Sequence, residues 1–204
     1  MIYDKFTYIE PPRAEKAIPP SLLKAYEMPG WVAQAKKNGT NSVIFIPPNR
    51  EMFAYNRHGV KHKNWSFNKD NSQAFQNLPG KGWYVFNAEL LHAKVKGLRD
   101  INYIHDILVD DGEYLGGTSY ASRYVKLQNL FFNQTMKAVP THWILNKHTW
   151  LARNFRDNFR ETFDSLKSDE DEGLVLKNMN GILQPKSNNS WTVKCRRNTK
   201  NFGF

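Results

Sequence analysis

The sequence has very little of several features that define common protein classes. Cys195 is the only cysteine among 204 residues, which excludes an internal disulfide framework and suits a reducing cytosol. No apolar run approaches the ~20 residues that a membrane-spanning helix needs, so no membrane partner is expected. The N-terminal stretch lacks the apolar core of a signal peptide, and no cysteine–histidine cluster has the spacing of a structural zinc site. We therefore expect an intracellular, cytoplasmic protein.

Acidic residues are also few compared with basic ones. The chain has 19 Asp and Glu against 29 Lys and Arg, which gives a net charge of +10. An excess of this size favours polyanionic partners such as nucleic acid or nucleotides. The alternative is a charge that serves solubility alone. With 40% hydrophobic and 14% aromatic residues, the chain has enough apolar material for a folded core.

The hydrophobic pattern mixes strand-like and helix-like segments. Residues 1–30 are rich in proline and are expected to form an irregular lead-in with a short helix at 21–27. Residues 61–81 are polar and are expected to form a long loop. Alternating or continuous apolar runs predict strands at 31–36, 42–47, 51–57, 83–91, 101–109, 138–145, 173–177 and 191–196. Apolar residues at helical spacing predict helices at 120–131 and 151–166.

Lys36 stands where an expected strand enters a polar turn. Gly39, three residues later, would let the backbone turn sharply and approach a ligand closely. A lysine on so stiff a support would suit a covalent nucleophile. The alternative is a β-hairpin with an Asn38-Gly39 turn and two exposed lysines. The neighbouring Lys37 is expected to be exposed.

Five short motifs, each at an expected strand end, occur in one order. They are KKNG at 36–39, NRHG at 56–59, FNAEL at 86–90, DEGLVLK at 171–177 and WTVKCR at 191–196. Their order and content resemble the adenylation domain of the covalent nucleotidyltransferases: ATP-dependent DNA ligases, RNA ligases and mRNA capping enzymes. The resemblance covers about residues 31–197 and favours nick-sealing RNA ligases or a minimal ATP-dependent DNA ligase. Residues 103–108 resemble the segment that places an aromatic ring against the purine, and 120–127 resemble an arginine-bearing helix.

This resemblance implies an α+β fold. Two mainly antiparallel β-sheets would be flanked by helices, with the nucleotide site between the sheets. Residues 1–204 would form a single nucleotidyltransferase domain. DNA ligases and capping enzymes have an OB-fold domain after the last motif, whereas this chain ends at Phe204, soon after Arg196. No C-terminal OB-fold domain is therefore expected, and the chain would be a minimal enzyme, a fragment, or a protein whose partner replaces the missing domain.

The resemblance also implies a chemistry for four residues. Lys36 would attack the α-phosphate of ATP, which yields a lysyl-AMP phosphoramidate and pyrophosphate. A free lysine has a pKa of about 10.4, so neighbouring cations or desolvation must depress it. Lys194 and Arg196 would supply positive charge and contact the α-phosphate. Glu172 would be a metal-binding or catalytic carboxylate, with Mg²⁺ or Mn²⁺ orienting the pyrophosphate.

Further residues would hold the nucleotide. Arg57 would contact the nucleotide or a 5′-phosphate, and Glu89 would bind the ribose or help to position the metal. His105 would stack on adenine, with Tyr103 as the substitute. Arg57 and Glu89 could instead be charged residues on a solvated rim, and His105 could be a satisfied core residue. Likewise, the acidic stretch 169–172 could be only a solvated turn.

Some positions depart from the family pattern. Gln34, which with Ala35 would contact the nucleotide, stands where a glutamate often precedes the lysine by two. Asn38 replaces an aspartate, and Arg196 replaces a lysine that is not equivalent to it at a phosphate. Cys195 lies between two phosphate-facing residues and should point to the opposite face as a small core residue.

The sequence therefore predicts a monomeric, ATP-dependent polynucleotide ligase that seals 5′-phosphate to 3′-hydroxyl ends in nicked duplex DNA or RNA. The alternatives are an mRNA-capping-type guanylyltransferase and a non-catalytic nucleic-acid-binding module with the same fold. Backbone phosphates would meet a basic surface made of Lys61, Lys63, Lys94, Lys96, Arg99, Arg197 and Lys200.

Overall fold

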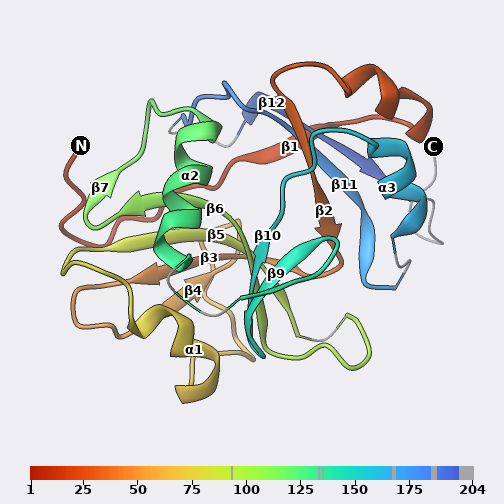
Figure 1. Ribbon diagram of the computed structural model, residues 1–204. Helices are drawn as coiled ribbons and strands as arrows, with labels where there is room; N and C mark the ends of the chain where they lie inside the picture. Colours follow the sequence, from red (N-terminus) through yellow and green to blue (C-terminus); the bar gives the residue numbers. More distant parts are fainter. Residues whose placement is uncertain (93, 133, 135, 167–168, 185–187, 198–204) are drawn as a thin grey trace.

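Two β-sheets form the framework of the molecule (Figure 1). The computed structural model describes residues 1–92, 94–132, 134, 136–166, 169–184 and 188–197. The small sheet has the strand order β1 (Arg13–Ala17), β12 (Asn188–Arg196), β11 (Asp171–Asn178) and β2 (Trp31–Lys37). The large sheet has the order β4 (Phe53–Tyr55), β3 (Thr40–Ile46), β5 (Tyr84–Leu91), β6 (Ile101–Asp110), β10 (Thr149–Ala152), β9 (His142–Asn146) and β8 (Lys137–Ala138), and β7 (Glu113–Tyr114) pairs with β6.

Most strand pairs are antiparallel, which confirms the predicted mainly antiparallel α+β arrangement. The parallel pairs among the described strands are β1 with β12 and β6 with β10. The two strands on either side of residues 38–39 belong to different sheets: β2 pairs with β11, whereas β3 pairs with β4 and β5. The simple hairpin considered for this stretch is therefore wrong, because the chain passes from one sheet to the other immediately after Lys37.

The helices are short and cover the outer faces of the sheets. They are η1 (Pro20–Tyr26), α1 (Lys69–Gln76), α2 (Tyr120–Phe131) and α3 (Phe159–Ser165). Behind the small sheet, Leu23 of η1 and Phe159 and Phe163 of α3 share a core with Leu174 and Leu176. Each fully buried side chain of this kind contributes roughly 1.5–3 kcal/mol relative to exposure. None of the described helices is long and apolar enough to cross a membrane.

A larger apolar core lies under α1 and α2. Phe75 of α1 packs against Phe86 of β5 and Phe131 of α2, with ring centres 5.8 and 6.3 Å from Phe75. In Figure 1, α2 stands beside β6, and α1 lies at the end of the molecule near β4. Each sheet is thus covered by helices on its outer face. The inner faces of the two sheets line the cavity between them.

Two sequence predictions were wrong in this framework. Residues 61–81 contain α1, whose apolar content is low, but Asn68 and Asn71 form a reciprocal capping box that begins the helix. The expected helix at 151–166 is β10 followed by a helix that begins only at Phe159. The helical spacing of its apolar residues is overridden because Leu151 lies in a parallel ladder beside β6.

The lead-in also contains more structure than expected. Residues Arg13–Ala17 form β1, which pairs with β12 at the edge of the small sheet. The sequence pattern does not predict this strand, because the residues around it are rich in proline. The strand forms nevertheless, since an edge strand needs partners on one side only. As a result, Arg13 reaches the cavity between the sheets.

Candidate active site

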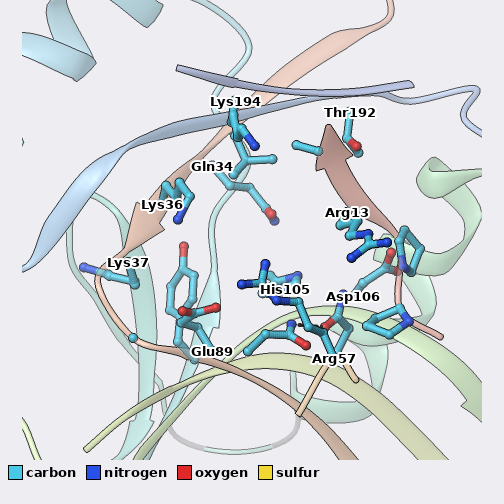
Figure 2. Close-up of a pocket in the computed structure, with 18 of the residues that line it drawn as sticks. Arg13, Gln34, Lys36, Lys37, Arg57, Glu89, His105, Asp106, Thr192 and Lys194 are labelled. Carbon is cyan, nitrogen blue, oxygen red and sulfur yellow. Dashed lines mark hydrogen bonds between the residues drawn. The ribbon is translucent and has the colours of Figure 1, made fainter. Parts of the chain in front are cut away.

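A cavity of about 330 Å³ lies between the two sheets, within the range of small-molecule sites. In Figure 2, Lys36 and Lys194 extend from the small sheet toward Glu89 on the opposite side. Every residue that the sequence singled out for the site lines this cavity: Gln34, Ala35, Lys36, Arg57, Glu89, His105, Glu172, Lys194 and Arg196.

Strand alternation explains how β12 supplies its part of the lining. Lys194 and Arg196 line the cavity, whereas Val193 and Cys195 are buried in the core behind the small sheet. This confirms the prediction that Cys195 points to the face of the strand opposite Lys194 and Arg196, as a small core residue. Burial, reinforced by the charges of Arg196 and Lys36, lowers the pKa of the Lys194 amine.

Lys36 lies at the centre of a charged group. Its Nζ forms an ion pair with Oε2 of Glu172, and Nε of Arg196 lies 3.5 Å from the same oxygen. The Lys36 and Glu172 side chains are 18% and 23% exposed, so both are partly desolvated and still reachable from the cavity. One carboxylate thus holds two cations at the lining of the cavity.

A β-bulge in β11 places Glu172 in this position. Asp171 pairs with Lys37 and Gly173 pairs with Lys36, which leaves Glu172 as the extra residue between them. Gly173 has φ +139°, and a Cβ there would lie 2.0 Å from the carbonyl oxygen of Cys195. Only glycine fits so close to β12. Glu172 is therefore a strand residue facing the cavity and not part of a solvated turn.

Lys37 is fully buried, so the prediction that it is exposed was wrong. Its Nζ forms ion pairs with Glu170 and, at 2.9 Å, with Oδ1 of Asp171. It also lies 5.7 Å from the ring centres of both Tyr103 and Trp150. The reason is the passage of the chain between the sheets, which turns the last residue of β2 inward. Burial raises the pKa of Asp171, and the charge of Lys37 opposes that rise.

Gly39 has a different role from the one expected of it. Its φ lies outside the left-handed region, so the turn does not need a glycine for its backbone conformation. A Cβ at this position would instead lie 2.6 Å from Cγ of Glu89 and 2.7 Å from the carbonyl oxygen of Leu90. The glycine thus allows the turn to pack against β5, and the amine of Lys94 donates a hydrogen bond to its carbonyl.

Tyr103 and His105, two residues apart on β6, both line the cavity. The Tyr103 hydroxyl donates to the Ala35 carbonyl at 3.1 Å, and its ring is buried. His105 is half-buried, and burial lowers its imidazole pKa well below the usual value, with Lys177 and Lys36 adding to the effect. Tyr103 therefore supports β2, the strand that carries Lys36, and His105 offers a neutral ring to a ligand.

Lys177 received no role from the sequence, although it closes the DEGLVLK motif. It lines the cavity, donates to the His105 carbonyl at 3.0 Å, and lies 4.5 Å from the ring centre of Tyr120. Burial lowers its pKa to about 8, with Asp106 opposing and Arg123 reinforcing the shift. One signal in the sequence could have identified Lys177 as a cavity residue. It lies an even number of residues beyond Gly173 and therefore on the same face of β11.

Two buried polar links hold the cavity wall in place. Gln34 donates through Nε2 to the Tyr120 hydroxyl at 2.9 Å, and that hydroxyl donates to Asn154 at 3.1 Å. Arg123 on α2 makes a two-pronged ion pair with Asp106 at 2.9 and 3.1 Å. The arginine-bearing helix is therefore joined to β6, and its guanidinium is buried.

Glu89 and Arg57 lie toward the mouth of the cavity. Burial raises the pKa of Glu89 to about 7, and the charges of Lys36 and Lys94 oppose that rise. Arg57 is exposed on a turn in which the Asn56 side chain accepts hydrogen bonds from two backbone amides, those of residues 58 and 60. The rim interpretation fits the exposure of Arg57, whereas Glu89 is half-buried in the cavity.

The donor set fits a magnesium ion that arrives with a nucleotide. Among the residues that the structure describes, no three His, Cys, Asp or Glu side chains gather as a metal site. Glu89 and Glu172 nevertheless both line the cavity. Mg²⁺ is commonly held by one or two protein carboxylates together with substrate phosphates and water.

The members of the predicted basic surface lie in different places on the molecule. Arg197 donates through Nη2 to the carbonyls of Phe163 and Leu166, at 2.7 and 2.6 Å. It therefore caps the end of α3, a contact that the sequence did not predict. Lys94 lines the main cavity. Lys200 lies outside the described residues.

No family model and no curated protein matches this sequence. Solved structures do match its fold. Mycobacterial DNA ligase D complexed with ATP and MES has a TM-score of 0.68 and 15% identity, over 94% of this chain and 62% of that chain. A Lig E DNA ligase structure has a TM-score of 0.57 and 14% identity, over 94% of this chain and 70% of that chain.

RNA ligases also match. A mutant of the Naegleria gruberi RNA ligase with ATP and Mn has a TM-score of 0.51 and 15% identity, over 97% of this chain and 59% of that chain. The chain spans about three fifths of the length of the ligase D and RNA ligase structures. The fold of this chain is thus that of the nucleotidyltransferase domain of ATP-dependent DNA and RNA ligases, as the sequence motifs implied.

Proposed function

We propose that this protein is an ATP-dependent polynucleotide ligase that acts through a covalent lysyl-AMP intermediate. The observation that supports it most is the position of Lys36. Its amine lies in the cavity between the sheets, ion-paired with Glu172, beside Arg196 and in the same lining as Lys194. A lysine nucleophile, a carboxylate and two phosphate-binding cations are the groups that nucleotidyl transfer requires.

In the first step the nitrogen of Lys36 attacks the α-phosphorus of ATP. The N–P bond forms, the bond from the α-phosphorus to the bridging oxygen breaks, and pyrophosphate leaves. Oε2 of Glu172, which pairs with this amine, would receive the proton that the amine loses. Lys194 and Arg196 stabilise the charge on the α-phosphate. Magnesium, held by Glu89 and Glu172 with the phosphates, would neutralise the leaving pyrophosphate.

The remaining residues hold the nucleotide in line for this attack. His105 offers its neutral ring to the adenine, beside Gln34 and the backbone of Ala35. Glu89, on the other side of the cavity, would contact the ribose. Fixed partners reduce the entropy lost when the nucleotide binds, and the hydrogen bonds of Gln34 to Tyr120 and of Tyr103 to Ala35 supply that fixation.

In the second step a 5′-phosphate oxygen of the polynucleotide takes the AMP from Lys36, which regains its amine. In the third, a 3′-hydroxyl attacks the activated phosphate, a phosphodiester forms and AMP leaves. Arg57 at the mouth of the cavity would contact the incoming 5′-phosphate. Nicked duplex DNA or RNA is the proposed substrate, and residues 1–204 are proposed to act as one nucleotidyltransferase domain in a monomer.

Incubation of the protein with α-labelled ATP or GTP, followed by denaturing electrophoresis, tests this proposal. Label from ATP that remains on the denatured protein, and that is lost on adding pyrophosphate, is the expected result. Label from GTP alone would indicate a capping-type guanylyltransferase. No label from either, with magnesium or manganese present, would favour a non-catalytic nucleic-acid-binding module.

A second assay tests the joining steps. The labelled protein is mixed with a duplex that contains one 5′-phosphorylated nick, in DNA and in RNA versions. Transfer of AMP to the nick and sealing of one version or both are expected. Adenylylation without any sealing would leave the ligase proposal unsupported beyond its first step and point to a required partner protein.

A further inference from the structure

A second groove opens next to the nucleotide cavity. One side is made by residues 61–66, and the other by His92, Arg99 and Asp100. The sequence predicted a polar loop here and a basic surface that includes Lys61, Lys63 and Arg99, but it predicted no groove. None of the steps above uses the groove, so its residues are free to serve another part of the reaction.

The groove is strongly cationic. Lys61, Lys63 and Arg99 line it and are exposed, and the Arg99 side chain is 78% exposed. Its single lining carboxylate, Asp100, lies 2.7 Å from Nδ1 of His92 and 3.9 Å from Arg99, so it is already in contact with other groups of the groove. Three exposed positive charges therefore face one already engaged negative charge.

The same two chain segments line both the groove and the cavity. Residues 56–58 line the cavity, and the groove begins three residues later, at Lys61. On the other segment, Lys94 lines the cavity, whereas His92 and Arg99 line the groove. The cations thus extend from the nucleophile, past Arg57 and Lys94 at the mouth, into the groove.

The groove is held by the framework of the large sheet. Lys61 forms a β-bridge with Tyr55, the last residue of β4. His62 lies 3.3 Å from the Ser42 hydroxyl of β3, and the Trp65 ring packs on Phe67 with centres 4.8 Å apart. Across the groove, the Asp100 carbonyl lies 3.1 Å from Nδ1 of His148. A preformed cationic surface of this kind binds anions with little ordering cost.

We propose that this groove holds the phosphodiester backbone of the polynucleotide next to the end that is being joined. The proposal rests on the ligase function above and extends it from the reacting phosphate to its neighbours. A backbone in the groove would continue directly to Arg57 and Lys36. Lysine and arginine contacts to phosphates release counterions, so binding here depends on salt and is tolerant of base sequence.

The test measures binding of a fluorescent nicked duplex with a 5′-phosphate to wild-type protein and to Lys63→Ala, Arg99→Ala and the double variant. The slope of log affinity against log salt should fall in magnitude by about 0.9 for each lost contact. Lys63→Arg should keep the wild-type slope. Lys24→Ala, an exposed lysine of η1 behind the small sheet, is the matched control and should also keep it.

A second arm replaces single phosphates near the nick by neutral methylphosphonates. Each replacement in the groove should weaken wild-type binding and have no further effect in the double variant. Covalent AMP labelling, measured on the same samples, should stay equal to wild type because ATP does not reach the groove. Unchanged salt slopes with normal AMP labelling would overturn the groove proposal alone, whereas absent labelling in wild type would overturn the ligase proposal.

Discussion

Lys36 and Lys37 are neighbours in the sequence but lie in opposite environments. Lys36 faces the cavity, paired with a single carboxylate that it shares with Arg196. Lys37 is buried, paired with two carboxylates and placed near two aromatic rings. Two adjacent lysines therefore have different roles. Lys36 is accessible from the cavity, and Lys37 joins two parts of the fold.

The comparison shows how a charged interior supports a charged site. Lys37 holds Glu170 and Asp171 at the point where the turn enters β11, just before Glu172. The amide of Asn38 adds a hydrogen bond to the Glu170 carbonyl at 2.9 Å. Because Glu172 is the bulged residue immediately after this turn, its carboxylate is directed toward the amine of Lys36. Buried ion pairs give little net stability but can fix one arrangement among several.

The largest expected effect separates the two lysines directly. Lys36→Ala should abolish covalent AMP labelling and leave the thermal unfolding temperature close to wild type, because the side chain lies in the cavity and not in the core. The measurement is label retained after denaturing electrophoresis, with calorimetry on the same sample. Label that survives in Lys36→Ala would show that another residue is the nucleophile.

The second effect concerns stability. Lys37→Met should lower the free energy of unfolding by roughly 3 kcal/mol, because it leaves two carboxylates without their cation in the interior. Urea denaturation measures this loss. Lys37→Met combined with Glu170→Gln and Asp171→Asn should recover much of it. If the single substitution is neutral, Lys37 does not hold the turn before Glu172.

The third effect concerns the cation that shares Glu172 with Lys36. Arg196→Ala should slow the phosphate-transfer steps at least ~10-fold, as expected for the loss of one charge-assisted contact. Arg196→Lys should retain measurable activity because the charge remains. The two variants are compared in single-turnover assays at saturating ATP. Wild-type rates in Arg196→Ala would mean that this arginine does not contact the phosphate.

The smallest effect is a pH dependence of the stability, which arises from the cavity carboxylate Glu89. The pKa of Glu89 is raised to about 7, so the folded protein keeps a proton that the unfolded chain releases near the usual value of 4.5. The folded state binds more protons in this window, and stability should therefore fall as pH rises from about 4.5 to about 7. After allowance for solvent, the change should be about 1 kcal/mol.

Glu89→Gln should remove this slope, and urea midpoints measured across the same pH window would show it. Asp110→Asn is a suitable control, because that carboxylate pairs with Lys126 on α2, outside the cavity lining. An identical slope in wild type and Glu89→Gln would mean that Glu89 titrates as an ordinary surface carboxylate.

The predicted site follows from local pattern to a large extent. The resemblance carried by the motifs implied that Lys36, Glu89, Glu172 and Lys194 belong together, and all four line the cavity between the sheets. Period-two alternation predicted that Cys195 faces away from its two cationic neighbours, because successive side chains of a strand point to opposite faces. The alternation is a property that a short stretch of chain determines by itself, whereas the grouping of the distant motifs came from the family resemblance.

The errors concern pairing between distant segments. The sequence alone determined most of the strands, although not β1 or β10, and the chemistry that the residues could perform. The tertiary structure decided that Lys37 is buried, that Gly39 packs against β5, and that Glu172 is bulged out of β11. These features depend on which strands lie side by side and in which register, and that choice is made by the packing of the two sheets and not by any local pattern.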